Sequence, residues 1–251
     1  MLTTMSAGVL DRFTRWPRQY TVLDLNAGPG RYRLPDGRVV DGTPILVLRR
    51  LAHSKLQSWR ALFIEADADI AAELRYWLDT EASLLGITTE QYKVVHGDHK
   101  QVVQPWVAES VPAKGGLGLI LHDPNGAPDF GLLESLTHNP QLERFDIVVY
   151  LQATPVKRVR GLPENYDTAG WQRLEEAMPH VKRHWVVREP SGSNQYALCI
   201  GSNGPLPGTW KRQRFWPLES DRGQDIFERI NLTARERRDF RQPGLFDILT
   251  E

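Results

Sequence analysis

The chain has 251 residues, of which 41% are hydrophobic and 25% are charged, and this composition is typical of a soluble globular protein with a sizeable core. Its 31 lysine and arginine residues balance its 31 aspartate and glutamate residues, so the net charge is zero and any contact with nucleic acid must use a local basic patch. The single cysteine, Cys199, excludes a disulfide framework and a cysteine-built zinc site.

The sequence shows no targeting or metal-binding signal. No apolar stretch approaches the roughly 20 residues of a membrane span, and residues 1–18 lack the hydrophobic region of a signal peptide. The 7 histidines show no metal-ligand spacing. We therefore expect a soluble, cytoplasmic protein without a membrane partner and without a bound metal.

Short β-rich runs alternate with amphipathic helical runs along the chain. The expected strands are residues 20–24, 61–65, 92–96, 117–122, 145–151, 184–188 and 195–200, and the expected helices are residues 44–56, 68–85, 101–111, 129–136 and 168–178. Strands that alternate with helices predict βαβ units and a parallel sheet. The linker over residues 189–194 is too short for a crossover helix, so the last two strands should form an antiparallel hairpin.

This order of elements predicts an α/β fold of the class I methyltransferase type, which is a Rossmann-like three-layer sandwich. Its sheet should have seven strands, mostly parallel, and should end in the C-terminal hairpin. We expect this domain to occupy residues 1–203. Beyond it the chain becomes rich in proline, tryptophan and basic residues and contains a helical tail over residues 225–240, so we interpret residues 204–251 as an extension packed on the same domain.

A glycine-containing loop follows the first expected strand. It begins at Asp24 and includes Asn26, Ala27, Gly28 and Gly30. Glycines allow the backbone to approach a ligand closely, and the amides that follow can face its polar groups. The alternative is a strand-to-helix turn that needs glycine for its own geometry. The acid at the strand end favours a cofactor-binding loop.

Acidic residues also lie at or just after the ends of two further expected strands. Glu65 closes the second strand, where a carboxylate can accept hydrogen bonds from both hydroxyls of a ribose. The alternative for Glu65 is a role in capping the next helix, which Asp67 could fill instead. Asp98 follows the third strand and could accept a hydrogen bond from an adenine amino group. Ligands of open α/β sheets bind beyond the carboxyl ends of the strands, so the positions of the three acids support one another.

The fourth expected strand leads into the run Asp123, Pro124, Asn125 and Gly126. An acid followed by a proline at this strand end resembles the Asp-Pro-Pro-Tyr motif of methyltransferases that act on the amino group of adenine. In those enzymes the carboxylate and a following backbone carbonyl hold the amine hydrogens and aim the nitrogen at the methyl group. An aromatic residue at the end of their motif stacks on the base; it is missing here, and Phe130 and Tyr150 are the candidates to replace it. The alternative is an ordinary turn, because all four residues are turn formers.

Taken together, these motifs resemble the three-Cys-motif partner (TcmP) family over roughly residues 20–200. The resemblance is carried by residues 24–32 (DLNAGPGRY), 41–45 (DGTPI), 63–65 (FIE), 96–98 (HGD) and 121–126 (LHDPNG). The same residues are similar to the ribosomal-RNA adenine-N6 methyltransferases. Both resemblances imply S-adenosylmethionine as the cofactor, and the first also implies a protein partner encoded nearby.

A basic cluster, Lys157, Arg158 and Arg160, follows the fifth expected strand. On the cofactor edge of the sheet these side chains could bind the phosphates of DNA or RNA, and a solvated face is the alternative.

The leading hypothesis is a methyltransferase that modifies an exocyclic amino group of a nucleic-acid base, with Asp123, Pro124 and Asn125 at its reaction centre. The alternative is a methyltransferase-fold subunit that binds nucleic acid or a protein without transferring methyl groups, or an enzyme that transfers another group. The Asn125-Gly126 replacement and the zero net charge favour this alternative.

Overall fold

The structure, a computed structural model, describes residues 19–113, 116–126, 128–152, 174–188, 196–204 and 214–231. Its strands are β1 (Tyr20–Asp24), β2 (Arg31–Arg33), β3 (Val39–Asp41), β4 (Trp59–Glu65), β5 (Tyr92–His96), β6 (Leu117–His122), β7 (Phe145–Gln152), β8 (His184–Arg188), β9 (Tyr196–Ser202) and β10 (Phe215–Pro217). Its helices are α2 (Thr43–Ala52), α3 (Ala68–Leu85), α4 (His99–Ser110), α5 (Phe130–Thr137), α7 (Leu174–Val181) and α8 (Asp221–Asn231).

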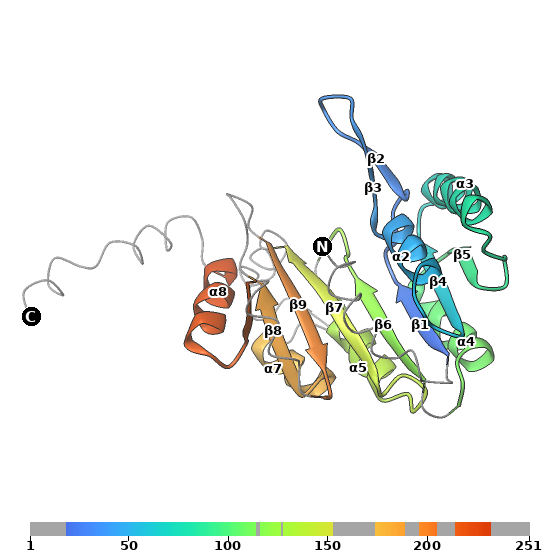
Figure 1. Ribbon diagram of the computed structural model, residues 1–251. Coiled ribbons are helices and arrows are strands. Elements are labelled where there is room, and N and C mark those ends of the chain that lie inside the picture. The colour runs from blue at the N-terminus through green and yellow to red at the C-terminus, as the bar shows by residue number, and fades with distance from the viewer. Residues whose placement is uncertain are drawn as a thin grey trace, which may run out of the picture. The chain divides into compact units, whose positions relative to one another are not determined.

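The strands follow the order β10-β8-β9-β7-β6-β1-β4-β5 in one eight-stranded sheet, and β2 and β3 form a separate two-stranded sheet (Figure 1). The chain divides into two compact units. The first lies within residues 1–124 and 132–148, and the second lies within residues 125–131 and 149–251. The boundary between them falls inside α5 and β7.

The first unit contains the parallel part of the sheet around β1. This strand pairs in parallel with both β4 and β6, and β5 continues the parallel sheet beyond β4. All five residues of β1 are buried, as expected of a strand that is covered on both faces. The strand order turns from one side to the other at β1, so the carboxyl end of this strand is the topological switch point where ligands of open α/β sheets bind.

The second unit contains the antiparallel strands. β8 pairs with β9 from His184 opposite Ser202 to Arg188 opposite Leu198, which confirms the predicted hairpin. β10 pairs antiparallel with the other edge of β8, and α8 contacts β8, β9 and β10. The predicted count of seven strands is therefore corrected to eight, because Phe215–Pro217 adds a strand with the fully buried Phe215.

A large, mostly parallel sheet with antiparallel strands at its C-terminal end confirms the predicted α/β fold of the class I methyltransferase type. Several helix ends differ from the prediction. α2 ends at Ala52 and not at residue 56, because the His53 and Ser54 amides donate to the carbonyls of Arg49 and Leu51 and close the last turn. α7 continues through Pro179 to Val181, beyond the expected end at residue 178.

The C-terminal extension is described only in part. α8 starts at Asp221, before the expected start at residue 225, and residues 232–251 lie outside the described residues. The predicted boundary between residues 203 and 204 stays a prediction. None of the described helices is long and apolar enough to cross a membrane.

A β-hairpin stands where the sequence suggested only a loop after residue 33. β2 and β3 pair antiparallel, with Arg31 opposite Asp41 and Arg33 opposite Val39. The turn is closed by the Gly37 amide, which donates to the Leu34 carbonyl at 2.9 Å, and Gly37 has a φ of +83° that suits glycine. In Figure 1 this hairpin projects away from the sheet above α2.

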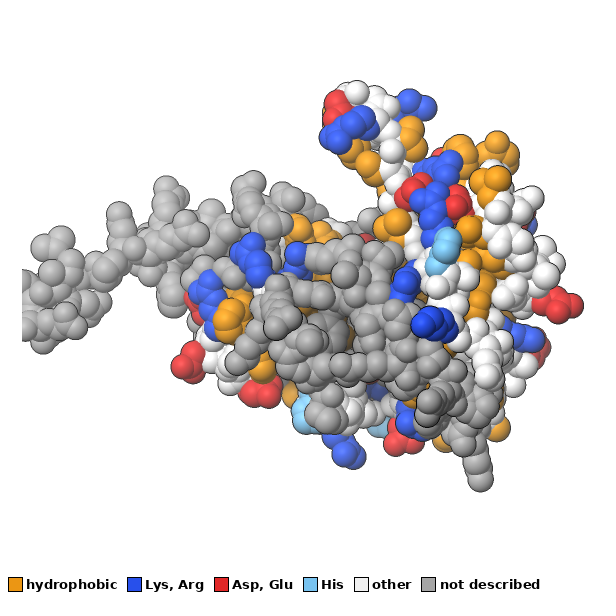
Figure 2. Space-filling view, in the orientation of Figure 1, with side chains coloured by type: hydrophobic (Ala, Val, Ile, Leu, Met, Phe, Trp, Pro, Cys, Tyr) orange, Lys and Arg blue, Asp and Glu red, His pale blue; other side chains and the backbone are white. Residues whose placement is uncertain are grey.

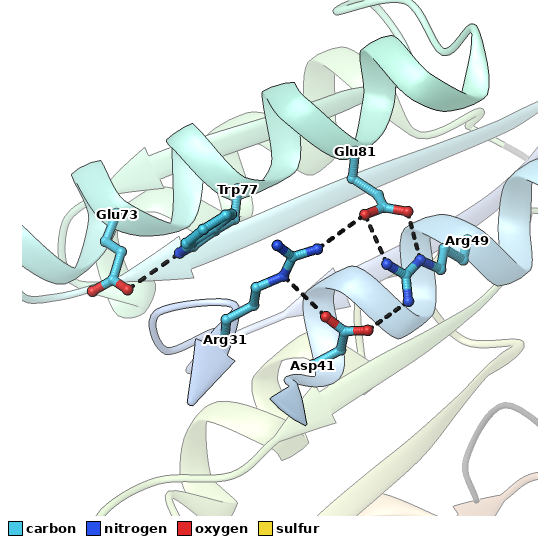
Figure 3. Close-up of polar contacts among 6 residues, drawn as sticks. All are labelled: Arg31, Asp41, Arg49, Glu73, Trp77 and Glu81. Atoms are coloured by element: carbon cyan, nitrogen blue, oxygen red, sulfur yellow. Dashed lines mark hydrogen bonds and ion pairs between the residues drawn. The ribbon is translucent and has the colours of Figure 1, made fainter. Parts of the chain in front are cut away.

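Ion pairs hold the base of the hairpin to α2 and α3 (Figure 3). Arg31 Nε lies 3.0 Å from Asp41 Oδ1, and Arg49 Nη2 of α2 donates to Glu81 Oε2 of α3 at 2.8 Å. Arg49 also pairs with Asp41, and Arg31 with Glu81. The Arg31 guanidinium lies 4.4 Å from the centre of the Trp77 ring, a cation–π contact. The hydrogen bond from Arg49 holds the pKa of the buried Glu81 carboxyl below its usual value.

Candidate active site

Asp24 lies at the carboxyl end of β1 and is almost completely buried, with 2% of its surface exposed. Its Oδ1 accepts a hydrogen bond from the Asn26 amide at 3.3 Å, whereas its buried Oδ2 has no hydrogen-bond partner among the described residues. Burial raises the pKa of Asp24 to about 7; the Asn26 hydrogen bond opposes this shift, and the neighbouring charges of Asp123 and Glu65 add to it.

The loop after Asp24 is held between the two strands that flank β1. The Leu25 amide donates to the Leu121 carbonyl of β6 at 3.0 Å, and the Ala27 amide donates to the Ile64 carbonyl of β4 at 2.9 Å. Gly28 has a φ of +67°, in the left-handed region that favours glycine. The loop is therefore fixed at the switch point by hydrogen bonds to both sides.

Gly30 serves the packing of α3 on this loop. Its φ is +79°, and a Cβ added there would lie 3.0 Å from the Leu74 Cδ1 atom of α3. The absence of a side chain at Gly30 therefore permits close packing against this helix, which is a known role of glycines in such loops.

Glu65 at the end of β4 binds the same loop directly. Its Oε2 accepts from the Gly28 amide at 2.9 Å, and its Oε1 accepts from the Asp67 amide at 3.0 Å. Asp67 caps α3 by accepting from the Asp69 and Ile70 amides, so the capping role goes to Asp67. A carboxylate has about four acceptor sites, so both oxygens of Glu65 keep capacity for ligand hydroxyls.

Asp98 is exposed and caps the N-terminus of α4. Its Oδ1 accepts a hydrogen bond from the Lys100 amide at 2.9 Å, which gives it a structural role that the sequence interpretation did not include. Its contact with an adenine amino group stays a prediction.

Asp123 follows β6 at the same edge of the sheet as Asp24. Although Asp123 is exposed, partial desolvation raises its pKa to about 6, and its charge contributes to the raised pKa of Asp24. Pro124 ends the first unit, and Asn125 and Gly126 belong to the second unit. The first unit thus brings Asp24, Glu65 and Asp123 within electrostatic range of one another.

His122 lies beside the candidate site, where the sequence interpretation gave it only a structural or solvent role. It is buried, with 2% exposed, and its Nδ1 lies 2.8 Å from Asn26 Oδ1. The amide oxygen accepts, so Nδ1 carries the proton in this arrangement. This hydrogen bond joins the glycine loop to the residue before Asp123. In the sequence, only the position of His122 next to Asp123 indicated that His122 lies near the site.

Tyr32 is a second residue near the candidate site to which the sequence interpretation gave no role. It lies on β2, and a Cβ added at Gly28 would overlap its hydroxyl oxygen. Burial raises the pKa of Tyr32, and the charges of Asp123, Asp24 and Glu65 raise it further. In the sequence, the position of Tyr32 two residues after Gly30 of the glycine loop indicated that this side chain could lie near the site.

Of the residues predicted to bind the substrate, the structure describes the two aromatic candidates but not the basic cluster. Phe130 begins α5 and is 6% exposed, so its ring offers little surface for stacking on a base. Tyr150 stacks on Tyr196, with their ring centroids 4.9 Å apart. Lys157, Arg158 and Arg160 lie outside the described residues. In the described part of the chain, no cluster of histidine, cysteine or acidic side chains could hold a metal ion.

The fold is similar to solved structures at low sequence identity. A protein from Legionella pneumophila, of the family DUF519, has a TM-score of 0.51 and 12% identity, and the match covers 92% of this chain and 90% of that chain. Spermidine synthase from Thermotoga maritima has a TM-score of 0.45 and 11% identity, and the match covers 95% of this chain and 73% of that chain. The N-terminal domain of human METTL16 in complex with SAH has a TM-score of 0.44 and 10% identity, and the match covers 81% of this chain and 68% of that chain.

These likenesses concern the fold alone. No family model matches the chain, and no curated protein matches it either. The resemblance to the TcmP family therefore stays a hypothesis.

Proposed function

We propose that this chain is an S-adenosylmethionine-dependent methyltransferase that acts on an exocyclic amino group of a nucleic-acid base. The observation that carries the proposal is the carboxyl group of Asp24 at the switch point, where one buried oxygen has no hydrogen-bond partner among the described residues. An unsatisfied buried polar atom costs on the order of 1–3 kcal/mol. A ligand that supplies the missing hydrogen bond would remove this cost, which is the behaviour expected of a binding site.

The residues around Asp24 fit the cofactor that the sequence implies. Gly28 and Gly30 give the loop its two positive φ angles, Glu65 keeps acceptor capacity for ribose hydroxyls, and Asp98 follows the end of the next strand. Asn26 and Ala27 complete the loop. When bound, S-adenosylmethionine would supply an electrophilic methyl group on a sulfonium.

Asp123 and Pro124 would hold the amino group that accepts the methyl. With a pKa of about 6, Asp123 is mainly ionised at neutral pH and can accept a hydrogen bond from the amine. Together with the backbone carbonyl of Pro124, it would aim the nitrogen lone pair at the methyl group. The attraction strengthens as positive charge develops on the nitrogen, so it lowers the barrier and does not merely tighten binding.

The test is Asp123→Ala, measured by transfer of radiolabelled methyl groups to mixed DNA and RNA. Loss of one preorganised group of this kind commonly lowers the rate by about 10²- to 10³-fold. We expect a loss of that size, while the dissociation constant of S-adenosylmethionine, measured by calorimetry, changes only by a few-fold. The matched control is Asp36→Ala, because Asp36 is an exposed acid at the hairpin tip.

Three outcomes separate the hypotheses. Equal transfer by wild type and Asp123→Ala would exclude the role of Asp123. Binding of S-adenosylmethionine without transfer to either nucleic acid would favour a non-catalytic subunit. Failure of the folded chain to bind S-adenosylmethionine or S-adenosylhomocysteine would exclude the cofactor.

The second candidate function is a methyltransferase-fold subunit that binds nucleic acid or a protein encoded nearby, or that transfers a group other than methyl. The replacement of the Pro-Tyr end of the adenine motif by Asn125-Gly126 favours it, because no aromatic residue follows Pro124 directly. The low exposure of Phe130 also favours this second candidate, because a buried ring cannot replace the missing stacking residue. Purification from co-expression with the neighbouring gene product would test for the protein partner.

A further inference from the structure

An aromatic side chain lies next to the acidic groups of the candidate active site. The Tyr32 side chain lies close to two glycines. A Cβ added at Gly42 would lie 2.9 Å from the Tyr32 Cε2 atom, and a Cβ added at Gly28 would overlap the Tyr32 hydroxyl. Gly42 has a φ of −80°, which any residue can adopt. Glycine at this position therefore serves to leave space for its neighbours, among them the Tyr32 ring.

The hairpin base fixes where this ring lies. Tyr32 stands between Arg31 and Arg33 on β2, and Arg31 is tied to Asp41 and Glu81 by ion pairs (Figure 3). The Gly42 amide also donates to the Gly30 carbonyl at 2.7 Å, which joins the end of the hairpin to the glycine loop. The ring is thus held beside the loop, while 46% of the residue remains exposed.

Three carboxyl groups that end or follow three different strands lie within electrostatic range of the Tyr32 hydroxyl. The charges of Asp123, Asp24 and Glu65 all act on the Tyr32 hydroxyl, and Asp24 presents a buried oxygen that has no hydrogen-bond partner among the described residues. Carboxylates next to an aromatic ring are the chemistry that recognises an onium cation, because the ring face and the carboxylates both attract positive charge.

We propose that Tyr32 contacts the sulfonium of the cofactor and makes the site selective for the charged cofactor over its neutral thioether product. The inference rests on the proposed function, since the sulfonium belongs to S-adenosylmethionine, and S-adenosylhomocysteine lacks that charge. A ring contact depends on the aromatic face and not on the hydroxyl. A purely structural role of Tyr32, by contrast, would affect the binding of both ligands equally.

The test compares the dissociation constants of S-adenosylmethionine and S-adenosylhomocysteine, measured by calorimetry at low salt, for wild type, Tyr32→Phe and Tyr32→Leu. We expect Tyr32→Phe to keep the wild-type ratio of the two constants within about twofold. Tyr32→Leu should raise the dissociation constant of S-adenosylmethionine about fivefold more than that of S-adenosylhomocysteine, which is the size expected of a partly exposed cation–π contact. Tyr76→Leu is the matched control, because Tyr76 is 62% exposed on α3.

Two results would overturn the inference while leaving the proposed function intact. One is an equal change for both ligands in Tyr32→Leu. The other is a loss of selectivity in Tyr32→Phe as large as that in Tyr32→Leu, because the hydroxyl would then be the recognising group. Circular dichroism would confirm that each variant is folded. Absence of binding of either ligand to the folded wild type would remove the proposed function and the inference with it.

Discussion

Asp24 is an ionisable residue at the end of a buried strand, and its surroundings make the stability of the fold depend on pH. Burial raises its pKa from 3.8 to about 7, with smaller contributions from the charges of Asp123 and Glu65. The unfolded chain loses this proton near pH 4, whereas the folded chain keeps it up to about pH 7. The folded state thus binds more protons between these values, so its stability falls as the pH rises through this window.

We predict that Asp24→Asn reduces this loss of stability, because the amide cannot ionise. Urea denaturation at pH 5 and pH 8 should show that wild type loses more stability between the two pH values than the variant. A difference of a few kcal/mol is the upper limit, since each pKa unit corresponds to about 1.4 kcal/mol. Asp36→Asn, at an exposed hairpin position, should behave as wild type. An identical pH response of Asp24→Asn and wild type would contradict the raised pKa.

At the scale of elements, the β2–β3 hairpin depends on its surroundings for its order. A two-stranded hairpin is only marginally stable in water, and this one exposes Tyr32, Val39 and Val40. Figure 2 shows hydrophobic, basic and acidic side chains together on the projecting part. Its base is held by Glu81, whose side chain is 6% exposed and which pairs with Arg31 and Arg49.

We predict that Glu81→Gln destabilises the fold by about 1–3 kcal/mol. Removing one partner of a fully buried pair costs about 3–5 kcal/mol, but the Arg49 side chain is 37% exposed, so solvent screening reduces the effect. Urea denaturation would measure the change, and limited proteolysis should cut the hairpin tip faster. Arg38→Gln, which removes the exposed pair with Asp36, should cost less than about 1 kcal/mol. Equal costs in the two variants would show that the cluster does not hold the hairpin.

At the scale of the whole molecule, the balance of 31 basic and 31 acidic residues means that any affinity for nucleic acid must be local. We predict that neutralising Lys157, Arg158 and Arg160 together weakens binding to an oligonucleotide at low salt. It should also flatten the logarithmic salt dependence by about one counterion for each lost phosphate contact. Fluorescence anisotropy over a salt series would measure both quantities. Unchanged affinity and salt dependence would show that the cluster is only a solvated face.

Much of the fold could be predicted because buried strands leave a local pattern. The runs ending at Asp24, His96 and His122 form strands with the predicted bounds. β1 is buried over its whole length, as its apolar run predicts, whereas in β5 the buried Tyr92 and Val94 alternate with more exposed residues, which is the period of a half-buried strand. β2, β3 and β10 were not predicted. Each has three residues, too few for an alternating or apolar pattern, and their pairing is decided by distant partners.

The sequence by itself determined that acids lie at successive strand ends beside a glycine loop, because strand order and residue identity are written along the chain. Only the tertiary structure decided how these acids are used. It showed that Glu65 accepts from the Gly28 amide, 37 residues away, and that His122 and Asn26 meet across 96 residues. It also left Asp24 Oδ2 buried without a partner among the described residues. Burial, hydrogen-bond satisfaction and electrostatic coupling depend on which segments pack together, and no local pattern in the chain encodes them.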